Sequence, residues 1–379
     1  MIRFFLSLIL TVTAIRHSAH SAELSRLKKE QRVGGFQVQN LYSDSDGKIM
    51  GAKFIHSSTG TPVFLLQLQT VPQVFTWVDT PTNSNQGLPH ALEHLLVAKG
   101  VQGHYFQLLH QMRLTPYGAA TFSDFVAYGL SSEGSVDDFF ESFHALLAAM
   151  YRPDFSDAEA SKEFYHFGVS TGRGSKKTLI EEGTVYDEMR ATQDRFRYYS
   201  ELNKRIFGAE SPFAFRAGGD PDQMRSVTPE DIRQFHDKYY RLGPSTGFIF
   251  VFPPQENVSA ILRKISDELQ QFSQSGAVSP AATSNPKYPF HSSNDLAPAI
   301  YPFPSPNAPA PGFIRFAWRP GKADSQEQLN CWKYLLARWQ TARVLYCKES
   351  SSIAKPALSI REQQRLIPNS SLITLLHTP

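Results

Sequence analysis

Two histidines and a glutamate, His90, Glu93 and His94, lie in an otherwise apolar segment between Gly87 and Gly100. The leucine and alanine pattern around them predicts a helix. Because residues i and i+4 of a helix share a face, both imidazoles could bind one metal ion. Glu93 flanks the same face and could act as the general base toward a water held by that ion. The spacing therefore predicts a Zn²⁺ site; the alternative is a helix whose histidines form ordinary hydrogen bonds.

A third protein ligand is expected on another element, and Thr178–Ala191 offers two glutamates. This segment is predicted to be helical, which would place Glu181 and Glu188 two turns apart on one face. One of them could bind the metal while the other supports a ligand histidine. The alternative is an acidic face exposed to solvent.

The elements that position these residues alternate between strand and helix patterns. Pro89 is suited to the first turn of the motif helix. Two strands are predicted at 51–68 around a turn at Thr59–Gly60, and single strands at 73–78, 120–130 and 246–254. Amphipathic helices are predicted at Ser135–Tyr151 and at Thr228–Tyr240, where Thr228 is the expected N-cap.

The N-terminus resembles a targeting segment. Arg3 precedes an apolar run from Phe4 to Ile15, and small residues follow before Glu23. This pattern predicts a signal peptide at 1–22 and a secreted or periplasmic protein. An organellar transit peptide is the alternative, because acidic residues are absent before Glu23, but such peptides are amphipathic rather than continuously apolar. No later segment is long and apolar enough to predict a membrane span.

Composition excludes several classes of protein. The net charge of +3 over 379 residues, without a block of like charges, argues against nucleic acid as a partner. The two cysteines, Cys331 and Cys347, are too few for a disulfide scaffold or a cysteine-based zinc site, although they could pair with each other.

A competing motif occurs at Gly168–Gly172, where the sequence GVSTG matches the nucleophile elbow of serine hydrolases around Ser170. That motif requires a strand before the serine and a helix after it. A basic loop follows instead, so we treat the serine-hydrolase hypothesis as the weaker one.

The order of several motifs resembles the pitrilysin/insulinase family of zinc peptidases, and its presequence-protease branch most of all. The resemblance covers about residues 35–275 and rests on these segments: TPTNSNQGLPHALEHLL, FIHSSTGTPVFLL, AATFSDFVAY, GTVYDEM and GGDPDQM. It implies that His90, His94 and Glu188 bind zinc and that Glu93 is the general base. Glu181 matches an auxiliary catalytic glutamate of the family.

The family also implies how substrate binds. An extended peptide adds to an exposed strand edge and receives main-chain hydrogen bonds. Ala119, Ala120 and Thr121 match that edge strand and are the predicted substrate-binding residues. Gly118 replaces an asparagine that is typical of the family, so a carboxamide near the scissile bond is missing.

The resemblance implies an α+β fold, with helices packed on a mainly antiparallel sheet. We predict a zinc peptidase domain at 30–273, a proline-rich linker at 274–312 and an incomplete second related domain at 313–379. Family members of this branch have four such domains in two halves, so a second chain could supply the other half.

The predicted function is that of a zinc-dependent endopeptidase acting on peptides or unfolded segments. The alternative is a non-catalytic binding or assembly subunit, or an inactive fragment, of the same fold.

Overall fold

The computed structural model describes residues 23–113, 117–171, 176–273, 314–318, 365–367 and 370–377. These residues fall into two compact units: one contains 23–193 and 215–273, and the other contains 194–214 and the short segments after residue 313. The predicted signal peptide at 1–22, the predicted linker at 274–312, both cysteines and most of the predicted second domain lie outside the described residues. Among the described helices, none combines the length and apolarity needed to cross a membrane.

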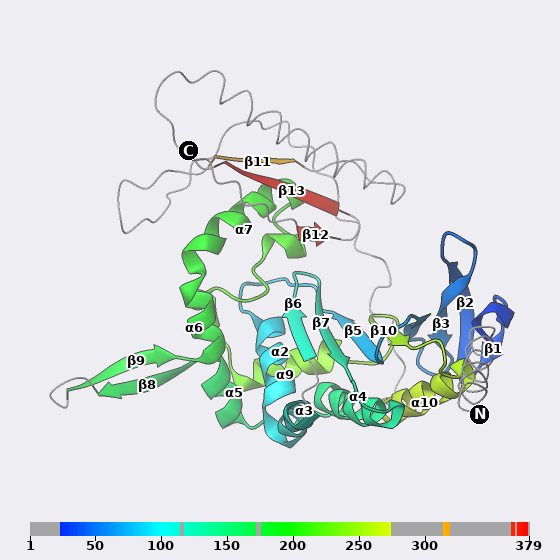
Figure 1. Cartoon of the computed structure of the whole chain (residues 1–379). Coiled ribbons are helices and arrows are strands. Elements are labelled where there is room, and N and C mark those ends of the chain that lie inside the picture. The colour runs from blue at the N-terminus through cyan, green and yellow to red at the C-terminus, as the bar shows by residue number, and fades with distance from the viewer. Residues whose placement is uncertain are drawn as a thin grey trace, which may run out of the picture. The chain divides into compact units, whose positions relative to one another are not determined.

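An eight-stranded sheet forms the centre of the first unit (Figure 1). Its strand order is β1-β2-β3-β4-β10-β5-β7-β6, and every neighbouring pair is antiparallel except β4 and β10. The strands are β1 (Arg32–Val33), β2 (Phe36–Ser43), β3 (Ile49–His56), β4 (Pro62–Gln67), β5 (Gln73–Asp79), β6 (Tyr117–Thr121), β7 (Phe125–Ser131) and β10 (Thr246–Phe252). The predicted fold class, helices on a mainly antiparallel sheet, is confirmed.

Helices cover this sheet, and Figure 1 shows α2, α3, α4 and α10 along one side of it. The helices of this unit are α2 (Leu88–Ala98), α3 (Gly100–Arg113), α4 (Val136–Tyr151), α5 (Asp157–Phe164), α6 (Thr184–Ala191), α8 (Pro221–Met224), α9 (Pro229–Tyr239) and α10 (Val258–Gln271). The predicted helices at Ser135–Tyr151 and Thr228–Tyr240 are confirmed as α4 and α9. Both begin with a capping box, closed by Ser135 and by Thr228.

The core lies between α4 and the central strands. Phe139 and Phe143 of α4 pack edge-on against Phe250, with ring centroids 6.4 Å and 5.1 Å apart. These rings and the neighbouring Phe248 are fully or almost fully buried. A continuously apolar strand such as β10 is expected at such a position, because apolar residues cover both of its faces.

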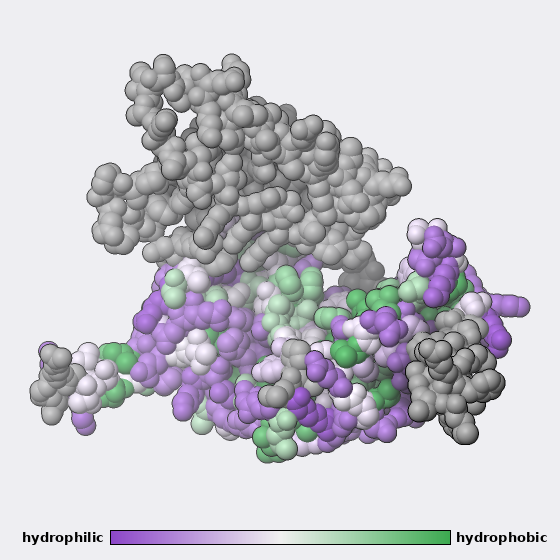
Figure 2. Space-filling view, viewed as in Figure 1, coloured by the Kyte–Doolittle hydropathy of each residue, from purple (hydrophilic) through white to green (hydrophobic). Residues whose placement is uncertain are grey.

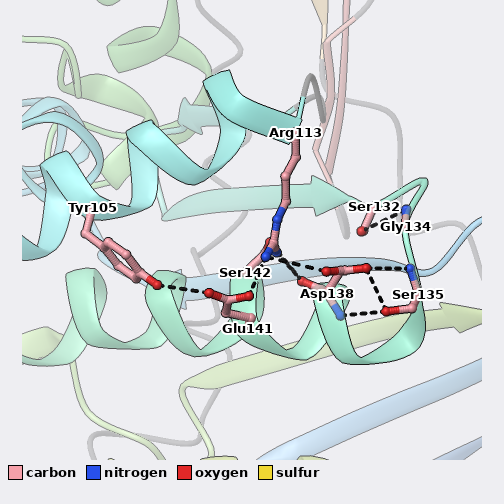
Figure 3. Close-up of polar contacts among 8 residues, drawn as sticks. All are labelled: Tyr105, Arg113, Ser132, Gly134, Ser135, Asp138, Glu141 and Ser142. Carbon is pink, nitrogen blue, oxygen red and sulfur yellow. Dashed lines mark hydrogen bonds and ion pairs between the residues drawn. The ribbon is translucent and has the colours of Figure 1, made fainter.

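A polar clamp holds the end of α3 on α4 (Figure 3). Arg113 donates to the Asp138 carbonyl at 2.8 Å and to the Ser142 hydroxyl at 3.2 Å, and it also pairs with the Glu141 carboxylate. The Tyr105 hydroxyl donates to the same glutamate at 3.0 Å. Since β6 follows α3 closely in the chain, this clamp helps to position the edge strand of the sheet.

Two sequence predictions about these elements were wrong. The segment 120–130 is not one strand, because the chain turns between β6 and β7 and the two pair as a hairpin. Thr178–Ala191 is not one helix: 177–182 is a strand, and helix α6 begins only at Thr184. Gly183 separates them with φ of 153°, a conformation that other residues rarely adopt.

The strand at 177–182 is β9 (Lys177–Glu182), and it pairs with β8 (His166–Thr171) to form a two-stranded hairpin that projects from the unit (Figure 1). Figure 2 shows apolar surface on this hairpin, where Phe167, Val169 and Leu179 are each at least 60% exposed.

The second unit contains α7 (Gln193–Phe207, except its first residue), the 3-10 turn η1 (Pro212–Ala214) and a three-stranded sheet. The sheet order is β11 (Ile314–Trp318), β13 (Ser370–His377) and β12 (Arg365–Ile367). All three strands lie within 313–379, the range predicted for the second domain.

Candidate metal centre

Helix α2 places both motif histidines on one face. Its N-cap is Gly87, which has a left-handed φ of 77°. Pro89 lies in the first turn, as predicted. The His90 and His94 rings lie one turn apart with centroids separated by 4.7 Å. His90 is buried, His94 is partly exposed, and helix α6 approaches α2.

Helix α6 brings Glu188 to the two histidines. Its Oε2 lies 3.6 Å from Nε2 of His90 and 3.7 Å from Nε2 of His94. Ligand atoms of these three residues all lie within 4.8 Å of one another, and no other such cluster of three or more occurs in the described part of the chain. The structure thus brings together the three residues that the sequence analysis assigned to the metal.

The donor set and its spacing fit zinc. A tetrahedral ion with bonds of about 2.0–2.1 Å separates its ligand atoms by about 3.4 Å, close to the 3.6 Å and 3.7 Å between the Glu188 oxygen and the two Nε2 atoms. Two imidazole nitrogens and one carboxylate oxygen form a common catalytic zinc set that leaves a fourth position open. The same donors also suit manganese or cobalt.

Hydrogen bonds to the other ring nitrogens determine which nitrogen faces Glu188. His90 Nδ1 lies 3.3 Å from the Gly218 carbonyl, and His94 Nδ1 lies 3.0 Å from a Glu163 oxygen. A carbonyl and a carboxylate only accept, so both Nδ1 atoms donate. The Nε2 atoms of the neutral rings are therefore free to bind a metal, which is the usual arrangement around zinc.

The sequence analysis missed Glu163. This glutamate lies on α5, almost completely buried, and its second oxygen is 2.9 Å from the Lys99 ammonium. The hydrogen bond from His94 is the main reason why the pKa of Glu163 falls to about 2, and Lys99 adds to it. Nothing in the local sequence of α5 distinguishes this residue from the exposed acids around it, because its partners are distant in the chain.

The two histidines have opposite pKa shifts. Burial lowers the pKa of His90, and the neighbouring His94 lowers it further. Burial also acts downward on His94, but the hydrogen bond to Glu163 and the charges of Glu93 and Glu188 outweigh it, so its pKa is raised. A metal ion requires the neutral ring, so a proton and a metal ion would compete for His94.

Glu93 and the edge strand are connected directly. The Thr121 hydroxyl donates to Glu93 Oε2 at 2.5 Å. β6 is the last strand of its sheet and pairs only with β7 among the described residues. Ala119 and Ala120 lie on it beside Thr121, and open space surrounds the position where Gly118 would carry a side chain.

Glu181 lies outside the three-residue cluster. It is the last residue but one of β9, and its carboxylate accepts from Arg225 Nε at 2.6 Å, from the Tyr165 hydroxyl at 2.8 Å and from the Tyr186 hydroxyl at 2.7 Å. Arg225 is the main reason why the pKa of Glu181 falls to about 2. The expectation that Glu181 shares a helix face with Glu188 was wrong. Glu181 lies in strand β9, Glu188 lies in helix α6, and Gly183 separates the two elements.

The serine-hydrolase hypothesis is contradicted. Ser170 lies inside β8 and pairs with Thr178 across the hairpin. A nucleophile elbow needs a sharp turn from a strand into a helix, whereas β9 is the next described element here.

The comparisons with known proteins find similar peptidases, although no family model matches the chain. The chain is 27% identical over 226 residues to a mitochondrial presequence protease of Drosophila melanogaster, covering 58% of this chain and 21% of that protein. It is 26% identical over 262 residues to the mitochondrial presequence protease of Mus musculus, covering 66% of this chain and 25% of that protein. The chain thus spans about a quarter of the length of the curated relatives it matches.

Solved structures show the same fold. Pitrilysin aligns with a TM-score of 0.57 at 16% identity, covering 91% of this chain and 35% of that one. A protease from Helicobacter pylori aligns with a TM-score of 0.52 at 13% identity, covering 85% of this chain and 73% of that one. The sequence relatives, the shared fold and the order of the motifs together support the resemblance of this chain to the pitrilysin/insulinase family of peptidases and to its presequence-protease branch.

Proposed function

We propose that this protein is a zinc-dependent endopeptidase that cleaves peptides or unfolded segments. The observation that carries the proposal is the cluster of His90, His94 and Glu188 with Glu93 on the same helix. The names of the sequence relatives, which are presequence proteases, support it.

A zinc ion held by His90, His94 and Glu188 would polarise the peptide carbonyl and acidify a water molecule. Glu93 takes the proton from the attacking water and later passes it to the leaving amine. Thr121 holds one oxygen of Glu93 by its hydroxyl, which leaves the other oxygen for the water. The chain therefore contains the base and its orienting group on neighbouring elements.

Substrate would bind along β6. The outer edge of this strand has unpaired main-chain groups among the described residues, and an extended peptide can add to such an edge by main-chain hydrogen bonds. The small side chains of Ala119 and Ala120 keep the strand accessible next to Thr121. This mode favours flexible peptides over folded proteins, because the substrate must be extended to pair.

We infer two further features of the whole protein. The matched region is about a quarter of the length of the relatives, and we keep a second chain as a proposed partner. The compartment in the relatives' names favours import into an organelle over secretion, so these relatives do not support the signal peptide predicted at 1–22.

Metal content and peptide turnover test the proposal together. We expect about one zinc per chain, lost in His94→Ala and retained in His104→Ala, an exposed histidine on α3. Glu93→Gln should keep zinc and abolish cleavage of an unstructured peptide, whereas Glu133→Gln should affect neither. Wild-type protein that binds no zinc would refute the proposal.

The second candidate is a non-catalytic binding or assembly subunit of the same fold. It predicts zinc binding without turnover, both alone and with candidate partner chains.

A further inference from the structure

Lys99 lies where α2 ends and has no role in the function proposed above. Its backbone is extended, and its N–H donates to the Leu95 carbonyl as the helix C-cap. The side chain lies over α5, so that its ammonium is 2.9 Å from Glu163 Oε2. The ammonium is partly sheltered, with 29% of the side chain exposed, and the carboxylate is almost completely buried at 9%.

Glu163 connects this ammonium to the metal centre. One carboxylate oxygen faces Lys99, and the other accepts from His94 Nδ1 at 3.0 Å. A buried carboxylate is costly unless it is both paired and hydrogen-bonded. Each oxygen has one such partner, so removing Lys99 would leave a buried charge held by the His94 ring alone.

The two histidines are held differently. His90 donates to a backbone carbonyl, that of Gly218, which the fold itself positions. His94 is more exposed, at 23% of its side chain against 9%, and depends on the side chain of Glu163 for its orientation. The geometry of the second ligand is therefore sensitive to whatever fixes that carboxylate.

We propose that Lys99 is a positioning residue for the metal centre: it fixes Glu163, which in turn fixes the His94 ring with Nε2 toward Glu188. This proposal rests on the metal-binding role proposed for His94. It assigns a function to the residue that directly follows the motif helix. A lysine that only formed a surface ion pair would have no influence on the metal.

Zinc affinity, measured by competition with a chelator, is the first test. Loss of an outer partner of a ligand histidine typically weakens metal binding by about 10–100-fold. We expect Lys99→Met to weaken zinc binding about 10-fold and Lys99→Arg to restore it to within about 3-fold, because arginine keeps the charge. Lys162→Met, on the exposed neighbour of Glu163 in α5, is the matched control and should leave the Kd unchanged.

A double variant tests whether Lys99 acts through Glu163. Glu163→Gln should weaken zinc binding by itself, and Lys99→Met/Glu163→Gln should be no weaker than Glu163→Gln within about 2-fold. If the two effects multiply instead, Lys99 acts on the centre by another route and the proposal is wrong. Comparing Lys99→Met with Lys99→Arg remains decisive if Glu163→Gln fails to fold.

A measurement without metal separates this proposal from the proposed function. Nitrogen NMR of the histidine rings, in metal-free protein under alkaline conditions, reports which ring nitrogen carries the proton. We expect the Nδ1–H form of His94 in the wild type and in Lys99→Arg, and a mixture of forms in Lys99→Met. If the wild type binds no zinc, the proposed function fails and this spectrum still decides the role of Lys99. An unchanged His94 spectrum in Lys99→Met refutes that role.

Discussion

The substitution Gly87→Ala should disturb the metal centre although it changes no ligand. Gly87 is the N-cap of α2 and has a φ of 77°. A Cβ added there would lie 2.8 Å from the Gly218 oxygen and 2.9 Å from Gly219 Cα. Both neighbours are backbone atoms, so no flexible side chain can move aside. The Gly218 carbonyl is also the acceptor for His90, which connects the clash to one of the proposed metal ligands.

The cost has two parts. A left-handed conformation costs an alanine about 1–2 kcal/mol. Overpacking against a rigid neighbour adds about 1–3 kcal/mol. We therefore expect Gly87→Ala to lower the free energy of unfolding by about 3 kcal/mol, which corresponds to a fall of about 6–12 °C in Tm for a unit of this size. Displacement of the Gly218 carbonyl should also weaken zinc binding about 10-fold.

Thermal unfolding and chelator competition measure the two effects, and Gly47→Ala is the matched control. Gly47 has nearly the same φ, 79°, but no atom lies within 4 Å of the position of an added Cβ. This control should show only the conformational cost, about 1–2 kcal/mol, and normal zinc affinity. Equal destabilisation by both substitutions, with zinc affinity unchanged in both, would refute the argument from close approach.

Three other predictions address the wider structure. Burial lowers the pKa of His56 from 6.5 to about 4, so the unfolded chain takes up the proton first as pH falls. The resulting stability is complete above pH 6.5, and about 3 kcal/mol of it is lost between pH 6.5 and 4. Denaturant titrations at several pH values should show this loss in the wild type; if His56→Gln shows the same loss, the assignment to His56 is wrong. Thr121→Val should lower kcat of peptide cleavage about 10-fold with zinc retained, because a hydrogen bond to a carboxylate is worth about 1.5 kcal/mol or more. Thr121→Ser should restore kcat, and full activity of Thr121→Val would exclude an orienting role toward Glu93. Glu181→Gln should lower Tm and leave the zinc stoichiometry unchanged, since the carboxylate lies outside the three-residue cluster; loss of zinc in metal analysis would show that it is a ligand.

Much of the fold and the centre of the site could be predicted from local patterns. The spacing of His90, Glu93 and His94 has a definite meaning on a helix, because the period of the helix puts the two histidines on one face. The strands β3, β4, β5 and β10 were recognisable for the same reason, since alternation or continuous apolarity reflects the faces that a strand buries. Glu188 required the family resemblance, since spacing alone could not choose between it and Glu181.

Local patterns failed where one residue changed the course of the chain. The apolar spacing of 178–191 suits a helix, but Gly183 lies close against the end of α5 and separates a strand from helix α6. The consequence for the site is large. Glu181 pairs with Arg225 at the end of β9, while Glu188 alone reaches the histidines.

The sequence by itself determined the helix, the two histidines, the glutamate between them and the apolar strands behind them, because neighbours a few residues apart specify each of these. Only the tertiary structure decided which groups surround them. Glu163 lies 69 residues after His94 in the chain, and Gly218 lies 128 after His90. Such partners meet through the packing of whole elements. In the sequence, a carboxylate that becomes buried cannot be distinguished from an exposed one, because its burial depends on where its helix packs.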